Sequence, residues 1–126
     1  MTATFRCPLN ADNLSYHVDG SVGADNQTGG TVTIRSITMD TKVTGIKGNW
    51  GNEALGRTST SDISPFSPKT VNAGSKATIK FTTVWTCSDP GTGNAGLYAD
   101  FAITLTLDTS AGKLKIGANK HRLEMT

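Results

Sequence analysis

Residues 77–87 read ATIKFTTVWTC and alternate between two kinds of side chain. One face would carry mostly apolar groups and the other mostly threonine and lysine; the apolar face holds Ala77, Ile79, Phe81, Thr83, Trp85 and Cys87. Successive side chains of a β-strand point to opposite faces, so an apolar period of two indicates a strand with one face in a core. This stretch therefore predicts a β-protein.

Other parts of the chain repeat this pattern. Residues 97–108 place Phe101, Ile103, Leu105 and Leu107 on one face. Nine residues rich in turn formers, SDPGTGNAG, join this segment to residues 77–87. We therefore expect the two segments to be antiparallel neighbours in one sheet.

Shorter segments complete the expected fold. Strands are expected at residues 5–9, 14–18, 31–43 and 67–71 and around Leu114 and Ile116. The apolar face slips by one residue between Ile34 and Ile37, which predicts a β-bulge near Arg35 and Ser36. About seven strands without an amphipathic helix are typical of an all-β, immunoglobulin-like antiparallel β-sandwich. At 126 residues, the chain is expected to be a single domain spanning 1–126.

The two cysteines fall on the apolar faces of their strands. Cys7 shares a face with Phe5, and Cys87 shares one with Trp85, so both should point into the core. We expect a disulfide between them, the alternative being two buried free thiols. A disulfide would place the protein in an oxidising setting, at an extracellular site, a cell surface or a virion.

Charge and hydropathy argue against some classes of partner. Residues 113–126 hold four basic residues and one glutamate but no aromatic side chain, so we interpret them as a solvated strand end and expect no nucleic-acid binding. No run approaches the roughly 20 apolar residues that cross a bilayer, so we expect no membrane insertion.

Catalytic and metal-binding patterns are weak. His17 and His121 are isolated in the sequence, and the chain has no G-x-S-x-G nucleophile-elbow motif. Residues 91–96, GTGNAG, match the dinucleotide-binding motif G-x-G-x-x-G, but we expect a strand after them, where that site needs a helix. A calcium site among Asp12, Asp19 and Asp25 is an open alternative without EF-hand order. We expect no enzyme activity, no cofactor and no metal.

Two aromatic residues are candidate ligand contacts. Trp50 lies between glycine-rich neighbours in residues 47–69, a region without a sustained period that could hide an edge strand. Trp50 would either plug the end of the sandwich or make exposed contacts. If it is exposed, Trp50 and Tyr98 could stack on carbohydrate.

Three segments carry a family resemblance: residues 14–22 (LSYHVDGSV), 26–37 (NQTGGTVTIRSI) and 68–81 (PKTVNAGSKATIKF). In their order of strands, Asn-rich turn and Pro-to-Gly turn, they resemble bacterial extracellular immunoglobulin-like modules of the cell-adhesion and conserved-repeat type. The resemblance implies a spacer, an adhesive module or an assembly subunit. Gly48-Asn-Trp, the turn at residues 73–75 and the loop at residues 91–96 are similar in order to actinoporin-like and aegerolysin sandwiches, which implies lipid binding.

The sequence therefore leaves three functions open. The first is a non-catalytic structural or interaction protein, part of a cell-surface or virion assembly, that contacts protein partners or copies of itself through sheet edges. The second is a carbohydrate-binding module that uses loop aromatics. The third is a sandwich that binds membrane lipids.

Overall fold

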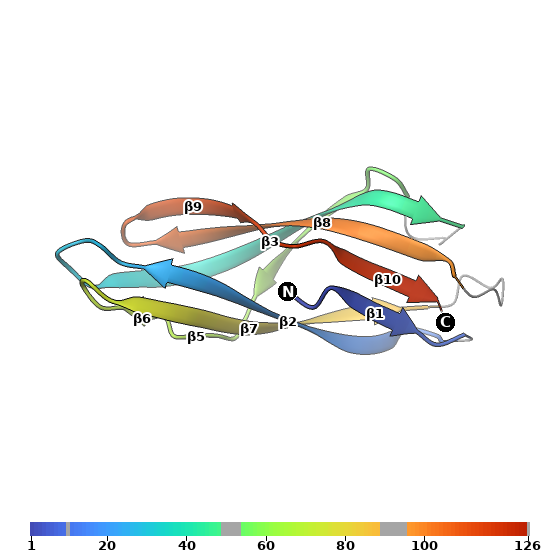
Figure 1. Cartoon of the computed structure of the whole chain (residues 1–126), viewed down its shortest axis with the longest axis horizontal. Helices are drawn as coiled ribbons and strands as arrows, with labels where there is room; N and C mark the ends of the chain where they lie inside the picture. Colours follow the sequence, from blue (N-terminus) through green and yellow to red (C-terminus); the bar gives the residue numbers. More distant parts are fainter. Residues whose placement is uncertain (10, 49–53, 89–95, 126) are drawn as a thin grey trace.

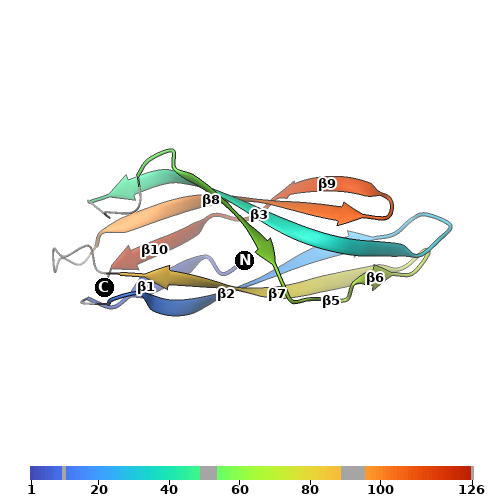
Figure 2. The ribbon, with the colours of Figure 1, turned by 180° about the vertical axis from the view of Figure 1, so that it is seen from behind.

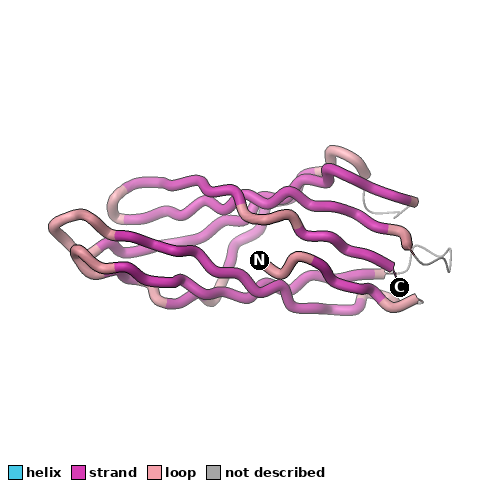
Figure 3. Tube along the Cα trace, viewed as in Figure 1, coloured by secondary structure: helices cyan, strands magenta, loops and turns pink. Residues whose placement is uncertain are grey.

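The computed structural model describes residues 1–9, 11–48, 54–88 and 96–125, and these ranges contain strands and turns but no helix (Figure 3). They form ten strands: β1 (Thr4–Cys7), β2 (Leu14–Asp25), β3 (Val32–Lys47), β4 (Thr58–Ile63), β5 (Phe66–Ser67), β6 (Thr70–Val71), β7 (Lys76–Cys87), β8 (Tyr98–Thr109), β9 (Gly112–Gly117) and β10 (His121–Met125). The all-β sandwich is confirmed. It has ten strands where the sequence predicted about seven, because the segment predicted at residues 67–71 divides into β5 and β6, and β4 and β10 are additional strands.

The strands are arranged in two sheets (Figures 1 and 2). The larger sheet has the order β1-β10-β8-β3-β4, with β6 also beside β3 and β9 also beside β8. The smaller sheet has the order β2-β7-β5. Paired strands are antiparallel except β1 and β10, which are parallel. Both β9 and β10 pair with β8 in antiparallel fashion, so they follow one another along the same edge of β8.

The core lies between the sheets and consists of alternate residues from each strand. Along β8, the buried side chains are Ala99, Phe101, Ile103, Leu105, Leu107 and Thr109. Across from them, β7 buries Ile79, Phe81 and Cys87, and β2 buries Tyr16, Val18 and Val22. The inward faces predicted from the apolar period of two are thus the faces that pack in the core.

The predicted pairing of residues 77–87 with residues 97–108 is wrong. β7 pairs with β2 and β5 in one sheet, and β8 pairs with β3, β9 and β10 in the other. The apolar period is the same whether two strands are neighbours in a sheet or face each other across a core. Sheets pack about 10 Å apart, a distance that a nine-residue connection spans easily.

The long strand β3 contains the bulge that the sequence predicts. Its register with β8 shifts between Ile34 and Ser36, which leaves Arg35 as the extra residue. A second shift, between Val43 and Gly45, had no signal in the apolar pattern. In residues 47–69, β4 is an edge strand beside β3 and β5 pairs with β7. Of the alternatives for this region, a hidden edge strand is present at β4.

The disulfide links the two sheets at one end of the sandwich. Cys7 at the end of β1 is bonded to Cys87 at the end of β7, with their Cα atoms 6.2 Å apart. Both residues are buried, as their alternation predicts.

The C-terminal segment is only in part the solvated strand end expected from its charge, because all of β9 is exposed whereas β10 is not. β10 lies between β1 and β8, and its residues alternate between buried and half-buried. His121, Leu123 and Met125 are the buried set, and His121 has no exposed surface. The apolar period of this strand therefore decides its position, and its net charge does not.

Candidate functional site

The N-terminal segment closes one side of the sandwich along half of its length. The backbone N–H of Thr2 donates to the Asp19 carbonyl of β2 at 2.8 Å, and the Arg122 N–H of β10 donates to the Ala3 carbonyl at 2.8 Å. Figure 1 shows β1 lying between β2 and β10 on this side. Residues 2–7 thus bridge the edges of the two sheets.

This bridge ends at Met1. Its ammonium donates to Asn119 Oδ1 at 2.6 Å, and Asn119 Nδ2 donates to the Met1 carbonyl at 2.8 Å. Asn119 lies in the connection between β9 and β10. Further along the same side, β9 pairs with β8 and, within the part of the chain that the structure describes, with no other strand.

An apolar cleft of about 260 Å³ opens between β2 and β9, which we call the β2–β9 cleft. Its apolar lining includes Val22, Ala24, Ile79, Leu107, Leu114 and Ile116. Leu114 and Ile116 are register partners of the buried Leu107 and Leu105, so they lie on the inner face of the sheet. Even so, Leu114 is 60% exposed and Ile116 is 39% exposed. The core at this edge is incompletely covered.

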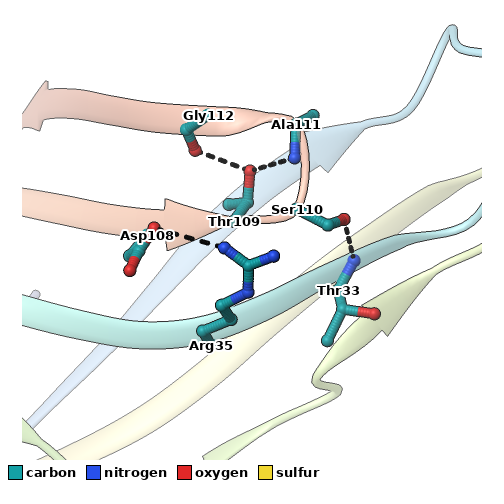
Figure 4. Close-up of polar contacts among 7 residues, drawn as sticks. All are labelled: Thr33, Arg35, Asp108, Thr109, Ser110, Ala111 and Gly112. Atoms are coloured by element: carbon teal, nitrogen blue, oxygen red, sulfur yellow. Dashed lines mark hydrogen bonds and ion pairs between the residues drawn. The ribbon is translucent and has the colours of Figure 1, made fainter.

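Hydrogen bonds hold the hairpin that carries β9 in place (Figure 4). Ser110 N–H donates to the Thr33 carbonyl, and Thr33 N–H donates to Ser110 Oγ, both at 2.9 Å. Within the turn, Thr109 Oγ1 donates to the Gly112 carbonyl at 2.7 Å and accepts from the Ala111 N–H at 3.1 Å. β9 is therefore anchored at its start to β3, although its outer edge is open.

A second cleft, of about 500 Å³, lies between β4 and β7 on the other side of the sandwich. Its lining is rich in hydroxyl groups and includes Thr41, Ser59, Ser61, Thr83, Thr86 and the Trp85 ring. Trp85 is half-buried, packs edge-on to Phe101 and His121, and donates from Nε1 to Thr83 Oγ1 at 2.9 Å. We call this the β4–β7 cleft.

The predicted ligand contacts Trp50 and Tyr98 are not brought together by any described contact. Trp50 lies outside the described residues. The Arg122 guanidinium lies 4.0 Å from the centre of the Tyr98 ring and binds the Asp100 carboxylate through two N–H groups, at 2.7 and 2.9 Å. Arg122 also holds the pKa of Asp100 below its ordinary value, with burial opposing the shift. One face of the Tyr98 ring is thus occupied by arginine, and sugar stacking there stays a prediction.

A buried polar cluster joins the N-terminal segment to the core. His121 Nδ1 lies 2.7 Å from the Thr2 carbonyl, which can only accept, so Nδ1 carries the proton. His121 Nε2 then accepts from the Tyr16 hydroxyl at 3.1 Å. Burial lowers the pKa of His121, the hydrogen bond to Thr2 opposes this, and the N-terminal charge lowers the pKa further. The spacing of His121 with Leu123 and Met125 was the sequence signal for this burial.

Comparisons with known proteins give no relative for this chain: no family model matches it, and no curated protein or solved structure matches it significantly. Among the described residues there is no helix long and apolar enough to span a membrane, and no group of three or more His, Cys, Asp or Glu side chains arranged to hold a metal ion. The function must therefore be argued from the clefts and edges themselves.

Proposed function

We propose that the protein is a non-catalytic structural or interaction subunit of a cell-surface or virion assembly, and that it contacts other chains through the open edge beside β9. The observation that carries this proposal is the exposure of Leu114 and Ile116 on the inner face of the sheet. Inner-face apolar side chains are normally covered, and exposed ones at a sheet edge mark contact surfaces.

The compartment in the proposal is supported by the disulfide between Cys7 and Cys87. Disulfides persist in extracellular, periplasmic and virion-surface settings and are rare in reducing compartments. A β-sandwich closed by a disulfide suits a subunit that must stay folded outside a cell.

Self-assembly is the first form of the proposal to test. The molar mass of the native protein is measured by size exclusion with light scattering over a range of concentrations, with negative-stain microscopy of the same samples. The double variant Leu114→Ser/Ile116→Ser removes the exposed apolar groups of β9. Val84→Ser is the matched control, because Val84 is an equally exposed aliphatic residue, at 63%, that lines the other cleft.

A multimer or filament that the β9 variant weakens and Val84→Ser leaves intact supports the proposal. A multimer that is indifferent to both variants refutes the role of this edge. If the protein is monomeric at every concentration, the proposal requires that the open edge bind a strand of another chain. A protein that neither self-assembles nor binds such a strand is not an assembly subunit of this kind.

A second candidate function is carbohydrate binding, supported by the β4–β7 cleft with its hydroxyl groups and Trp85. The chain has two tryptophans, so Trp50→Phe leaves Trp85 as the sole indole fluorophore. Glycans that bind in this cleft should change the Trp85 emission of that variant. If Trp50 is the stacking residue instead, the Trp50→Phe variant loses binding altogether.

A further inference from the structure

We propose that the β2–β9 cleft receives an extended strand from a different protein chain, in which apolar residues alternate with acidic ones, and that this strand pairs with the outer edge of β9. The inference rests on the proposed function, because it treats this side of the sandwich as a contact surface. It adds the identity of the occupant as a chemical class.

The backbone of β9 offers a row of groups for such a strand. The Ala118 N–H donates to the Ile103 carbonyl at 2.9 Å, so the backbone groups of Ala118 point toward β8. The same holds for every second residue before it, Ile116, Leu114 and Gly112. In an antiparallel ladder these residues alternate, so the N–H and C=O groups of Lys113, Lys115 and Gly117 point away from β8. A strand that adds to the edge would bond to these groups.

The inward side of the added strand would meet the apolar lining. The cleft of about 260 Å³ lies just below the range of about 300–1,000 Å³ typical of small-molecule pockets. Its size suits one or two aliphatic side chains, and its apolar lining offers them Val22, Leu107, Leu114 and Ile116. Because strand side chains alternate, these apolar residues must occupy every second position of the occupant.

The outward side of the added strand would lie beside two lysines. Lys113 and Lys115 alternate with Leu114 and therefore project from the outer face of β9. Lys113 is opposite Asp108, whose carboxylate also lies 4.0 Å from Arg35, and Lys115 is opposite the neutral Thr106. The local charge is positive, and opposite charges on neighbouring strands stabilise a sheet. Acidic residues therefore suit the outward positions.

The same lysines argue against a second copy of β9 as the occupant. Two β9 strands paired edge to edge would bring Lys113 and Lys115 of one copy beside those of the other. Like charges on neighbouring strands destabilise the pairing. A strand from another chain, with acidic residues at these positions, meets no such repulsion.

β1 shows that this side of the sandwich accepts a strand. It pairs with β10 and places Cys7 in the core, with its preceding residues bonded to β2. β10 and β9 follow one another along β8, so β1 fills one half of the side and the β2–β9 cleft is the other half. The proposed strand would extend the arrangement that β1 begins.

The test uses fluorescently labelled peptides of about eight residues, slightly longer than a typical strand of 5–6 residues. One alternates valine and glutamate, one has the same composition with the valines in a single block, and one alternates valine and lysine. We expect the Val/Glu peptide to bind at least about tenfold more tightly than either of the others in fluorescence anisotropy at low salt. On binding, amide exchange should slow at Lys113, Lys115 and Gly117.

Three variants of the protein keep the test independent of folding defects. Leu114→Asp should lower the affinity for the Val/Glu peptide by about tenfold or more, whereas Val84→Asp in the other cleft should leave it unchanged. Lys115→Glu changes only the outer face, and it should shift the preference towards the Val/Lys peptide.

Three results overturn the inference: equal binding of the blocked peptide, amide protection at β2 or β4 in place of β9, or self-assembly of the protein through β9. In the first and third results β9 or its neighbourhood still binds chains, so the proposed function survives without this occupant. If no peptide binds and the protein is monomeric, both proposals fail.

Discussion

Leu107 and Leu114 are register partners on adjacent strands and lie on the same face of the sheet, yet Leu107 is 4% exposed and Leu114 is 60% exposed. The difference arises because β8 has neighbours on both sides, β3 and β9, whereas β9 has β8 alone among the described strands. Substitution of Leu107 therefore tests packing in the core, whereas substitution of Leu114 tests contacts with other chains.

The first prediction concerns these leucines. Leu107→Ala should lower the free energy of unfolding by about 2–5 kcal/mol, because it leaves a cavity in the core. Leu114→Ala should change it by less than about 1 kcal/mol, because most of the side chain is already in water. Urea denaturation of both variants checks this, and similar losses would mean that Leu114 is buried in solution.

For β7 and β8 the sequence was sufficient to predict most of the residues that face the core. In β7 and β8 the period of two identified the inward positions, and the one-residue slip after Ile34 identified the bulge at Arg35. These features are local, since each depends on a few neighbouring residues and on the geometry of one strand.

Pairing partners and the cleft were not predictable in the same way. The alternation of apolar residues in β7 and β8 fits two strands of one sheet as well as two strands of opposite sheets. Only the structure shows that β7 and β8 lie in different sheets. Likewise, Leu114 and Ile116 have the pattern of buried residues, and their exposure depends on which strands lie beside β9 in the folded chain. Both the pairing of the strands and the exposure of these two residues depend on contacts between segments far apart in the sequence.

The second prediction compares two glycines of β2. A Cβ at Gly20 would lie 2.6 Å from Cε2 of the Phe81 ring, which is buried. Gly20→Ala should therefore destabilise the fold by about 1–3 kcal/mol. Gly23→Ala meets nothing within 4 Å and is the control, with an expected change within about 0.5 kcal/mol. Thermal unfolding distinguishes them, and equal melting temperatures would contradict the close contact.

The third prediction concerns the disulfide. Cys7 and Cys87 are 80 positions apart, and closing a loop of that length stabilises a fold by about 4–5 kcal/mol in the chain-entropy model. Cys7→Ala/Cys87→Ala should lose about that much in urea denaturation. Wild-type protein treated with a reductant is the parallel sample and should show a similar loss. An unchanged midpoint in both would show that the cysteines are not bonded in solution.

The fourth prediction is a pH dependence that arises from His121. Burial holds its pKa below the ordinary value of 6.5, so between the two values the unfolded chain binds the proton that the folded chain excludes. Stability from this group is therefore fully present above pH 6.5 and is lost as the pH falls towards the lowered pKa. The free energy of unfolding should decrease steadily between about pH 7 and pH 5.

One substitution identifies the source of that slope. His121→Gln keeps a group that can donate to Thr2 and accept from Tyr16 but does not titrate, so it should flatten the pH dependence even if it lowers stability. Measurements are confined to pH 5–7.5 because Asp100, whose pKa is held below its ordinary 3.8, loses its contribution only in more acidic solution. A slope that persists in His121→Gln would place the titrating group elsewhere and would contradict the neutral, buried state of His121.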